Sequence, residues 1–293
     1  PARSLDGLAL RNTARNPTRG TLSLGMTAAA CFLIFSVAAF RLDPSQSLPA
    51  IHSGNGGFWL LGETDQPIFA DLNTPAGRQS LGFSAEDAPQ LDTFRIFPLR
   101  LQSGEDAGCL NLYRPHQPRV LGVPKPFRER GGFSFAGGSA PRDAAASGPG
   151  PWGLLERRKE AESPRSPIPA ILDDATVKYS LHLSGVGAEF EILDGRGRSA
   201  RLRVVATLQN SIFQGNVLIA EEDFVSLFPD TPGYRYFLVE PRTTPAGAAV
   251  SRANAPSPED WREAARRLQR ILERQCLDYG MTMTLTTDRL AAL

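Results

Sequence analysis

The chain is poor in the residues that carry most enzyme chemistry, with three histidines and three cysteines among 293 residues. His52, His116 and His182 stand apart in sequence, and none belongs to an HExxH, CxxC or mixed Cys–His pattern that predicts a bound metal. A metal site assembled from distant parts of the chain stays open. No GxxxxGK[ST] motif occurs, which excludes a P-loop for ATP, and no GxSxG or SxxK pattern nominates a nucleophile.

The chain also lacks a large excess of either positive or negative charge. The 32 Lys and Arg nearly balance the 31 Asp and Glu, so bulk charge indicates no nucleic-acid partner. Glu63 with Asp65, and Asp173 with Asp174, have the residue types of paired catalytic carboxylates, but acids at turns and strand ends are far commoner. We therefore predict no catalytic, cofactor-binding or metal-binding residue, and a protein that is not an enzyme.

Cysteine pairing is open. Cys31 lies within an apolar run, whereas Cys109 and Cys276 could form one disulfide in an oxidising compartment. A single spacing does not establish that bond, and we prefer two unpaired, buried cysteines.

One long charge-free run organises the chain. Residues 21–40, TLSLGMTAAACFLIFSVAAF, contain no charged side chain. A helix of this length spans about 30 Å, the thickness of the hydrocarbon core of a bilayer. The run therefore predicts a transmembrane helix. Its small residues, including Gly25 and Ala29, favour packing against other membrane helices.

The charges around this run predict its orientation. Arg3, Arg11, Arg15 and Arg19 precede the run, and Arg41 alone follows it closely. This bias predicts a cytoplasmic N-terminus and an extracytoplasmic main domain, with residues 1–20 as a cytoplasmic or interfacial amphipathic segment. A cleaved signal peptide, or a lipoprotein leader ending before Cys31, is the alternative.

The remaining chain predicts an α+β fold with two lobes. Both ends carry a β-α-β pattern, and the middle is rich in strands. We assign residues 41–115 and 230–293 to one discontinuous lobe and residues 116–229 to an inserted β-rich lobe. Within it, residues 137–167 have the Gly, Pro, Ser and Ala content of a linker. Residues 242–255 form a second linker.

Several elements have clear local signals. Residues 94–101 predict a half-buried strand with Pro98 at an edge or bulge, and a weak helix falls within residues 71–82. Two alternating runs flank Asp194-Gly-Arg-Gly197, which predicts a β-hairpin. Helical spacing predicts a helix from Pro258 that ends before Gly280. Its buried stripe comprises Trp261, Ala265, Leu268, Ile271 and Leu272.

Four segments together resemble a known family. They are LALRNTARNPTRG before the span, GGFWLLGETDQPIFADLNTPAGR, CLNLYRPHQPRVLGVP, and SIFQGNVLIAEEDFVSLFPDTPGYRYFLVE. These segments resemble the FtsX-like permeases of ABC transporters, especially members with an extracytoplasmic domain like that of macrolide exporters or lipoprotein-releasing permeases. The resemblance covers nearly the whole chain.

The resemblance implies a fold and a set of partners. The discontinuous lobe is then a βαβ porter-like lobe. The partners are a cytoplasmic ABC ATPase subunit, further transmembrane helices of the same or a second permease, the lipid bilayer of the cell (inner) membrane, and an extracytoplasmic protein or lipoprotein. The implied function is non-catalytic: coupling the ATPase to movement of the outer domain in export, lipoprotein release or mechanotransmission. A singly anchored extracytoplasmic binding domain or enzyme is the competing hypothesis.

Overall fold

The computed structural model describes residues 17–40, 48–104, 118–138, 150–156, 166–242 and 258–292. The chain divides into two compact units, Pro1–Asp43 and Pro44–Leu293. The predictions for residues 1–16, for Cys109 and for His116 fall outside the described residues.

The first unit contains the helix α2 (Pro17–Phe40), whose 24 residues include the charge-free run. The helix begins at Pro17, a position where the missing N–H of proline costs nothing. Its large apolar side chains are exposed, with Leu24 at 74% and Phe35 at 73%. Within the described ranges, no helix is long and apolar enough to cross a membrane. The predicted span therefore stays a prediction.

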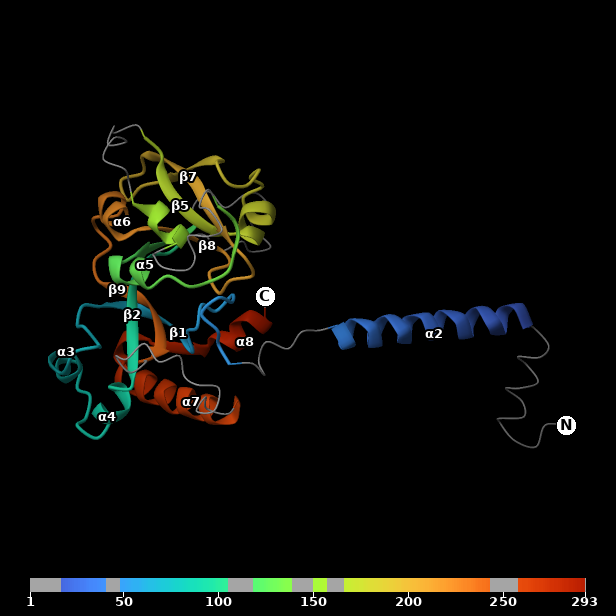
Figure 1. Ribbon diagram of the computed structural model, residues 1–293, viewed down its shortest axis with the longest axis horizontal. Helices are drawn as coiled ribbons and strands as arrows, with labels where there is room; N and C mark the ends of the chain where they lie inside the picture. Colours follow the sequence, from blue (N-terminus) through green and yellow to red (C-terminus); the bar gives the residue numbers. More distant parts are fainter. Residues whose placement is uncertain are drawn as a thin grey trace. The chain divides into compact units, whose positions relative to one another are not determined.

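The second unit is built on one sheet, and the elements from the two ends of the chain form one half of it (Figure 1). The strands of this half lie in the order β10-β1-β9-β2. Its elements are β1 (Leu60–Ile68), α3 (Pro75–Ser80), α4 (Ala88–Leu91), β2 (Phe94–Gln102), β9 (Tyr234–Pro241), α7 (Pro258–Gln275), the 3-10 turn Leu277–Tyr279, β10 (Thr282–Leu285) and α8 (Thr286–Ala291).

This half interleaves two split β-α-β units. β1 and β2 both pair antiparallel with β9, and β9 and β10 both pair antiparallel with β1. The strands therefore lie in the chain order fourth, first, third, second, which is the ferredoxin-like arrangement. The predicted stripe of α7 is buried against one face of these strands, with Trp261 and Leu268 fully buried.

The middle of the chain forms the other half of the sheet, in the order β3-β8-β5-β7-β4, with β6 paired to β7. The predicted hairpin is confirmed, because β6 and β7 pair across the Asp194 turn. The elements of this half are β3 (Arg119–Val123), α5 (Lys125–Arg130), β4 (Phe135–Gly138), the 3-10 helix Gly150–Leu155, β5 (Ile168–Asp173), the π-helical turn Thr176–Ser180, β6 (Glu189–Leu193), β7 (Ser199–Leu208), β8 (Asn216–Ala220) and α6 (Glu221–Leu227).

The two halves are joined at a seam, where β2 pairs with β3 from Arg100 to Gln102. Pro98 precedes this stretch and lies where β2 pairs with β9 alone, so its missing N–H is tolerated as predicted. A single apolar core crosses the seam and includes Phe97 and Leu238 of one half and Leu121 and Phe213 of the other. The division into lobes at the predicted boundaries stays a prediction.

Two expectations need correction. The strand at residues 94–101 is buried on both faces, not one, because Phe94 and Ile96 enter the α7 core while Phe97 and Leu99 enter the core across the seam. Part of the expected linker is also ordered. Trp152 is fully buried, packs edge-on against Phe127 and donates from Nε1 to the carbonyl oxygen of Gly132 at 3.0 Å. One large aromatic anchors a segment whose average composition is that of a linker.

Candidate functional site

A polar cleft of about 390 Å³ opens beside the seam. Residues from five separate stretches of the chain line it, because the sheet order β10-β1-β9-β2-β3 places these five strands next to one another. Its polar lining comprises Glu63, Thr64 and Asp65 of β1, Ser103, Arg119 of β3, Arg235 of β9, Thr282 and Thr284 of β10, and Arg289 of α8.

Among the described residues, the cleft contains one ion pair and three further charged side chains that form none, Asp65, Arg235 and Arg289. Arg119 donates from Nη2 to Glu63 Oε2 at 2.7 Å, which links β3 to β1 across the two halves of the sheet. Arg235 donates from Nε to the carbonyl oxygen of Thr64 at 3.0 Å. Over the described parts of the chain, neither the Arg289 guanidinium nor the Asp65 carboxylate has a hydrogen bond or ion pair. These two groups are available to a ligand.

Two hydroxyl groups complete the electrostatics. The Thr64 hydroxyl is buried, and no described residue forms a hydrogen bond with it. Burial raises the pKa of Tyr236, and the charge of Glu63 raises it further, whereas Arg119 and Arg289 oppose the shift. Tyr236 is therefore a neutral, buried phenol beside the cleft. The described lining offers charges and hydroxyls, which are groups that bind a polar or charged ligand.

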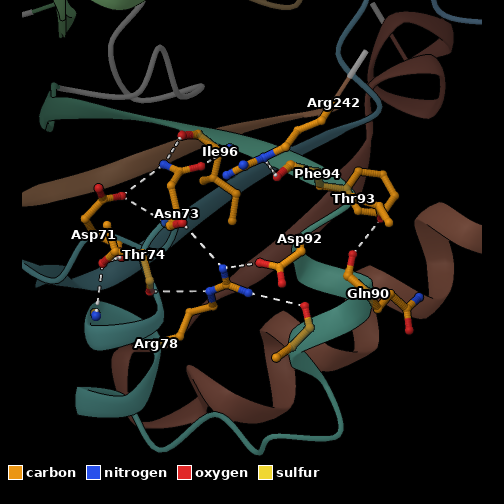
Figure 2. A network of polar contacts seen from close by, with 12 residues as sticks. Asp71, Asn73, Thr74, Arg78, Gln90, Asp92, Thr93, Phe94, Ile96 and Arg242 are labelled. Carbon is orange, nitrogen blue, oxygen red and sulfur yellow. Dashed lines mark hydrogen bonds and ion pairs between the residues drawn. The ribbon is translucent and has the colours of Figure 1, made fainter. Parts of the chain in front are cut away.

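A second polar network lies at the outer edge of β2 (Figure 2). Asn73 Nδ2 donates to the carbonyl oxygen of Ile96 at 2.8 Å, and the Ile96 N–H donates to Asn73 Oδ1 at 2.8 Å. The side-chain amide thus satisfies the backbone groups that a further strand would otherwise bind. Asp71 Oδ1 accepts from the Asn73 backbone N–H and from its Nδ2, and holds this amide in place.

Arg78 connects this edge to the helices. Its guanidinium forms an ion pair with Asp92 and donates at 3.4 Å to the carbonyl oxygens of Asn73, Thr74 and Ala88 (Figure 2). A cavity of about 280 Å³ adjoins it, with Phe83 and Leu91 among its walls. These hydrogen bonds join α3 and α4 to each other and to the edge of β2, so the network fixes the two helices to the strand.

The two pairs of acidic residues considered as catalytic candidates, Glu63 with Asp65 and Asp173 with Asp174, lie in different environments. Glu63 and Asp65 both line the cleft, whereas Asp173 is buried and accepts from the backbone N–H groups of Ser211 and Ala175. Asp174 pairs with Lys178 one helical turn away. No group of three or more metal-ligating side chains occurs in the described segments.

Sequence reasoning missed the arginines of the cleft. Arg119, Arg235 and Arg289 stand far apart in the chain, and the strand pairing alone brings them together. Nothing in the local sequence distinguishes them from other surface arginines.

Comparisons with known proteins find ten similar chains among the solved structures, including the following two. The periplasmic region of MacB from Actinobacillus actinomycetemcomitans is 14% identical with a TM-score of 0.35, and the match covers 82% of this chain and 93% of that one. The extracellular domain of the noncanonic ABC-type transporter YknZ from Gram-positive bacteria is 10% identical with a TM-score of 0.29, and the match covers 77% and 99%. No family model and no curated protein matches the sequence. At these low scores, the function proposed below rests on the chain's own residues.

Proposed function

We propose that this chain is part of a permease subunit of an FtsX-like ABC transporter and is not an enzyme. In this proposal α2 is a membrane helix at the cell (inner) membrane, its N-terminus is cytoplasmic, and residues 44–293 are extracytoplasmic. A separate cytoplasmic ATPase drives movements of this outer domain, and the domain passes them to an extracytoplasmic protein or lipoprotein. The four sequence segments that resemble such permeases motivate the proposal.

One observation carries it: residues near the start of the second unit lie beside α8, its last described helix. The Thr286 N–H at the start of α8 donates to the carbonyl oxygen of Trp59 at 3.0 Å, just before β1. A Cβ on Gly54 would lie 3.3 Å from Cδ2 of Leu290. A domain placed between two consecutive membrane helices needs this geometry, because both helices must start from one end of the domain.

A second observation supports the membrane position of α2. Seven large apolar side chains of this helix are exposed, and none of them belongs to an apolar core of the described chain: Leu22, Leu24, Met26, Phe32, Leu33, Ile34 and Phe35. Water disfavours such a surface, whereas lipid or neighbouring membrane helices would cover it. The charge-free stretch from Thr21 to Phe40 fits the same environment.

Cysteine labelling in intact cells tests the proposal. The full chain, with Cys31, Cys109 and Cys276 replaced by serine, receives a single cysteine at Ser4 or at Ser103. A membrane-impermeant maleimide should label the cysteine at position 103 in intact cells. It should label the cysteine at position 4 only after the cells are lysed. Equal labelling of both in intact cells, or a mature protein without residues 1–40, would refute the permease topology and leave a secreted domain.

A matched pair of substitutions tests the role of α2. Leu33→Asp places a charge in the middle of the helix, where insertion costs about 2.5–3.5 kcal/mol. Alkaline extraction should then release the chain from the membrane fraction. Phe69→Asp is the control, because Phe69 is 68% exposed, close to the 62% of Leu33, but lies in the second unit. Retention of the Leu33→Asp variant would show that α2 does not anchor the chain.

A further inference from the structure

We propose that the polar cleft binds a carboxylate, with Arg289 and Arg235 as the cationic contacts and a threonine hydroxyl as an added donor. The inference concerns the second unit alone and does not depend on the membrane role proposed above. It starts from the described residues, among which the Arg289 guanidinium and the Thr64 hydroxyl have no hydrogen-bond partner and Arg235 has one bond, to a backbone carbonyl oxygen.

The charges of the cleft select the charge of the ligand. Its lining carries three arginines, Arg119, Arg235 and Arg289, and two carboxylates, Glu63 and Asp65. Glu63 is occupied by Arg119, at 2.7 Å. The lining therefore has an excess of one positive charge, which a singly charged carboxylate would neutralise. A dianionic phosphate would leave an excess of negative charge beside Asp65, so the cleft favours a carboxylate.

The hydroxyl groups suit the same ligand. Thr64 is 3% exposed, and its Oγ1 has no partner among the described residues, which costs free energy in the unliganded protein. Thr282 and Thr284 also line the cleft, and β10 is a terminal strand of the sheet. Arginine guanidinium groups and hydroxyls together can donate to both oxygens of a carboxylate.

Asp65 lies at one boundary of the cleft, beside Gly280, and its carboxylate can accept a hydrogen bond from the ligand. A Cβ on Gly280 would lie 2.4 Å from Asp65 Oδ2, so only glycine leaves room for this carboxylate there. Gly280 also has a φ of +67°, a conformation that glycine adopts at no steric cost. Asp65 can accept from an N–H of the ligand. The chemistry is then that of a carboxylate with an adjacent amide N–H, as in an N-acylated amino acid or the C-terminus of a peptide.

Isothermal titration calorimetry of the full chain with N-acetylglycine tests the inference. We expect saturable binding of N-acetylglycine, weaker binding of inorganic phosphate and no binding of the neutral N-acetylglycinamide. Arg289→Gln should weaken N-acetylglycine binding at least about tenfold, which corresponds to the loss of one hydrogen bond to a charged group. Thr64→Val should weaken it about threefold and leave the urea midpoint unchanged or higher, because it removes an unsatisfied hydroxyl.

Controls separate binding from folding. Arg196→Gln removes an exposed arginine at the β6–β7 turn, outside the cleft, and should leave the affinity unchanged. Each variant is accepted only with a far-UV spectrum like that of the parent chain. N-acetyl-triglycine distinguishes the two sources of the carboxylate: tighter binding than N-acetylglycine assigns the cleft to a peptide C-terminus, and equal binding assigns it to small acids.

Three results would overturn the inference. They are no heat of binding with either carboxylate, equal affinity for the neutral amide, and an Arg289→Gln variant with the affinity of the parent chain. None of these results bears on the membrane topology, and a secreted domain could still bind a carboxylate here.

Discussion

Arg78 is the residue on which the outer edge of the sheet depends. Its side chain is 6% exposed, whereas that of its partner Asp92 is 60% exposed. The arginine therefore brings its charge into the protein, and the carboxylate that neutralises it stays in contact with water. Removing the two partners should have unequal effects.

We predict that Arg78→Met lowers the free energy of unfolding by about 2–3 kcal/mol, because the ion pair with Asp92 and the hydrogen bonds of the guanidinium to three carbonyl oxygens are lost. Asp92→Asn should cost about 1 kcal/mol, since water can replace part of what the carboxylate provided. Urea unfolding of the full chain measures both values. Arg196→Met, at an exposed turn, is the matched control and should change stability by less than about 0.5 kcal/mol. Equal losses for Arg78→Met and Arg196→Met would contradict the assignment.

Asp194 gives the hairpin turn a dependence on pH. Its Oδ1 accepts from the backbone N–H groups of Arg198 and Arg196, at 2.8 and 2.9 Å. The backbone hydrogen bond from Arg198 is the main cause that lowers the pKa of Asp194, and burial opposes it. A carboxyl group whose pKa is lowered by folding stabilises the native state above its unfolded pKa, and this contribution is lost as the pH falls through the folded value.

We therefore predict that Asp194→Asn is less stable than the parent chain at pH 7 and that the difference narrows below about pH 4. The measurement is the urea midpoint of both chains at several pH values between 7 and 2.5. A difference that is constant over this range would show that the ionised carboxylate contributes nothing to the turn.

Among the elements, α7 shows how the buried face of an amphipathic helix contributes more to the free energy of unfolding than the exposed face. Leu268 is fully buried between the helix and the sheet, while Arg267, next to it, is exposed and pairs with Glu263. Leu268→Ala should cost about 3 kcal/mol, from the lost burial and the cavity left behind. Arg267→Ala should cost less than about 0.5 kcal/mol, since exposed ion pairs contribute little. Similar urea midpoints for the two variants would place α7 outside the core.

The same helix shows what could be predicted from the sequence. The stripe from Trp261 to Leu272, the Asp194 hairpin and the strand with Pro98 depend on local patterns, and all three are present. The second buried face of β2 was missed because it depends on a core that the middle of the chain supplies. The cleft was missed for the same reason: its arginines meet through strand pairing across the whole second unit, and no local pattern records that pairing.

For the whole molecule, the central question is whether the two halves of the sheet unfold together. The core that crosses the seam contains Leu61, Phe97 and Leu238 of one half together with Leu121 and Trp152 of the other. Residues 44–293 also form one compact unit. Separating the halves would expose this core to water, so partial unfolding at the seam is costly.

We predict one cooperative transition for the second unit, and the three tryptophans provide the test. Trp59 and Trp261 pack together in the α7 core, and Trp152 packs against Phe127 in the other half. In Trp152→Phe, the remaining tryptophans report on the half of the sheet that packs against α7. In the double variant Trp59→Phe, Trp261→Phe, the remaining Trp152 reports on the other half. Within each variant, the urea midpoint from fluorescence should equal the midpoint from far-UV circular dichroism. Comparing two probes in the same variant removes the effect of the substitution on stability. If fluorescence and circular dichroism give separate midpoints in either variant, the halves unfold independently, and the core across the seam does not hold the second unit together as one cooperative unit.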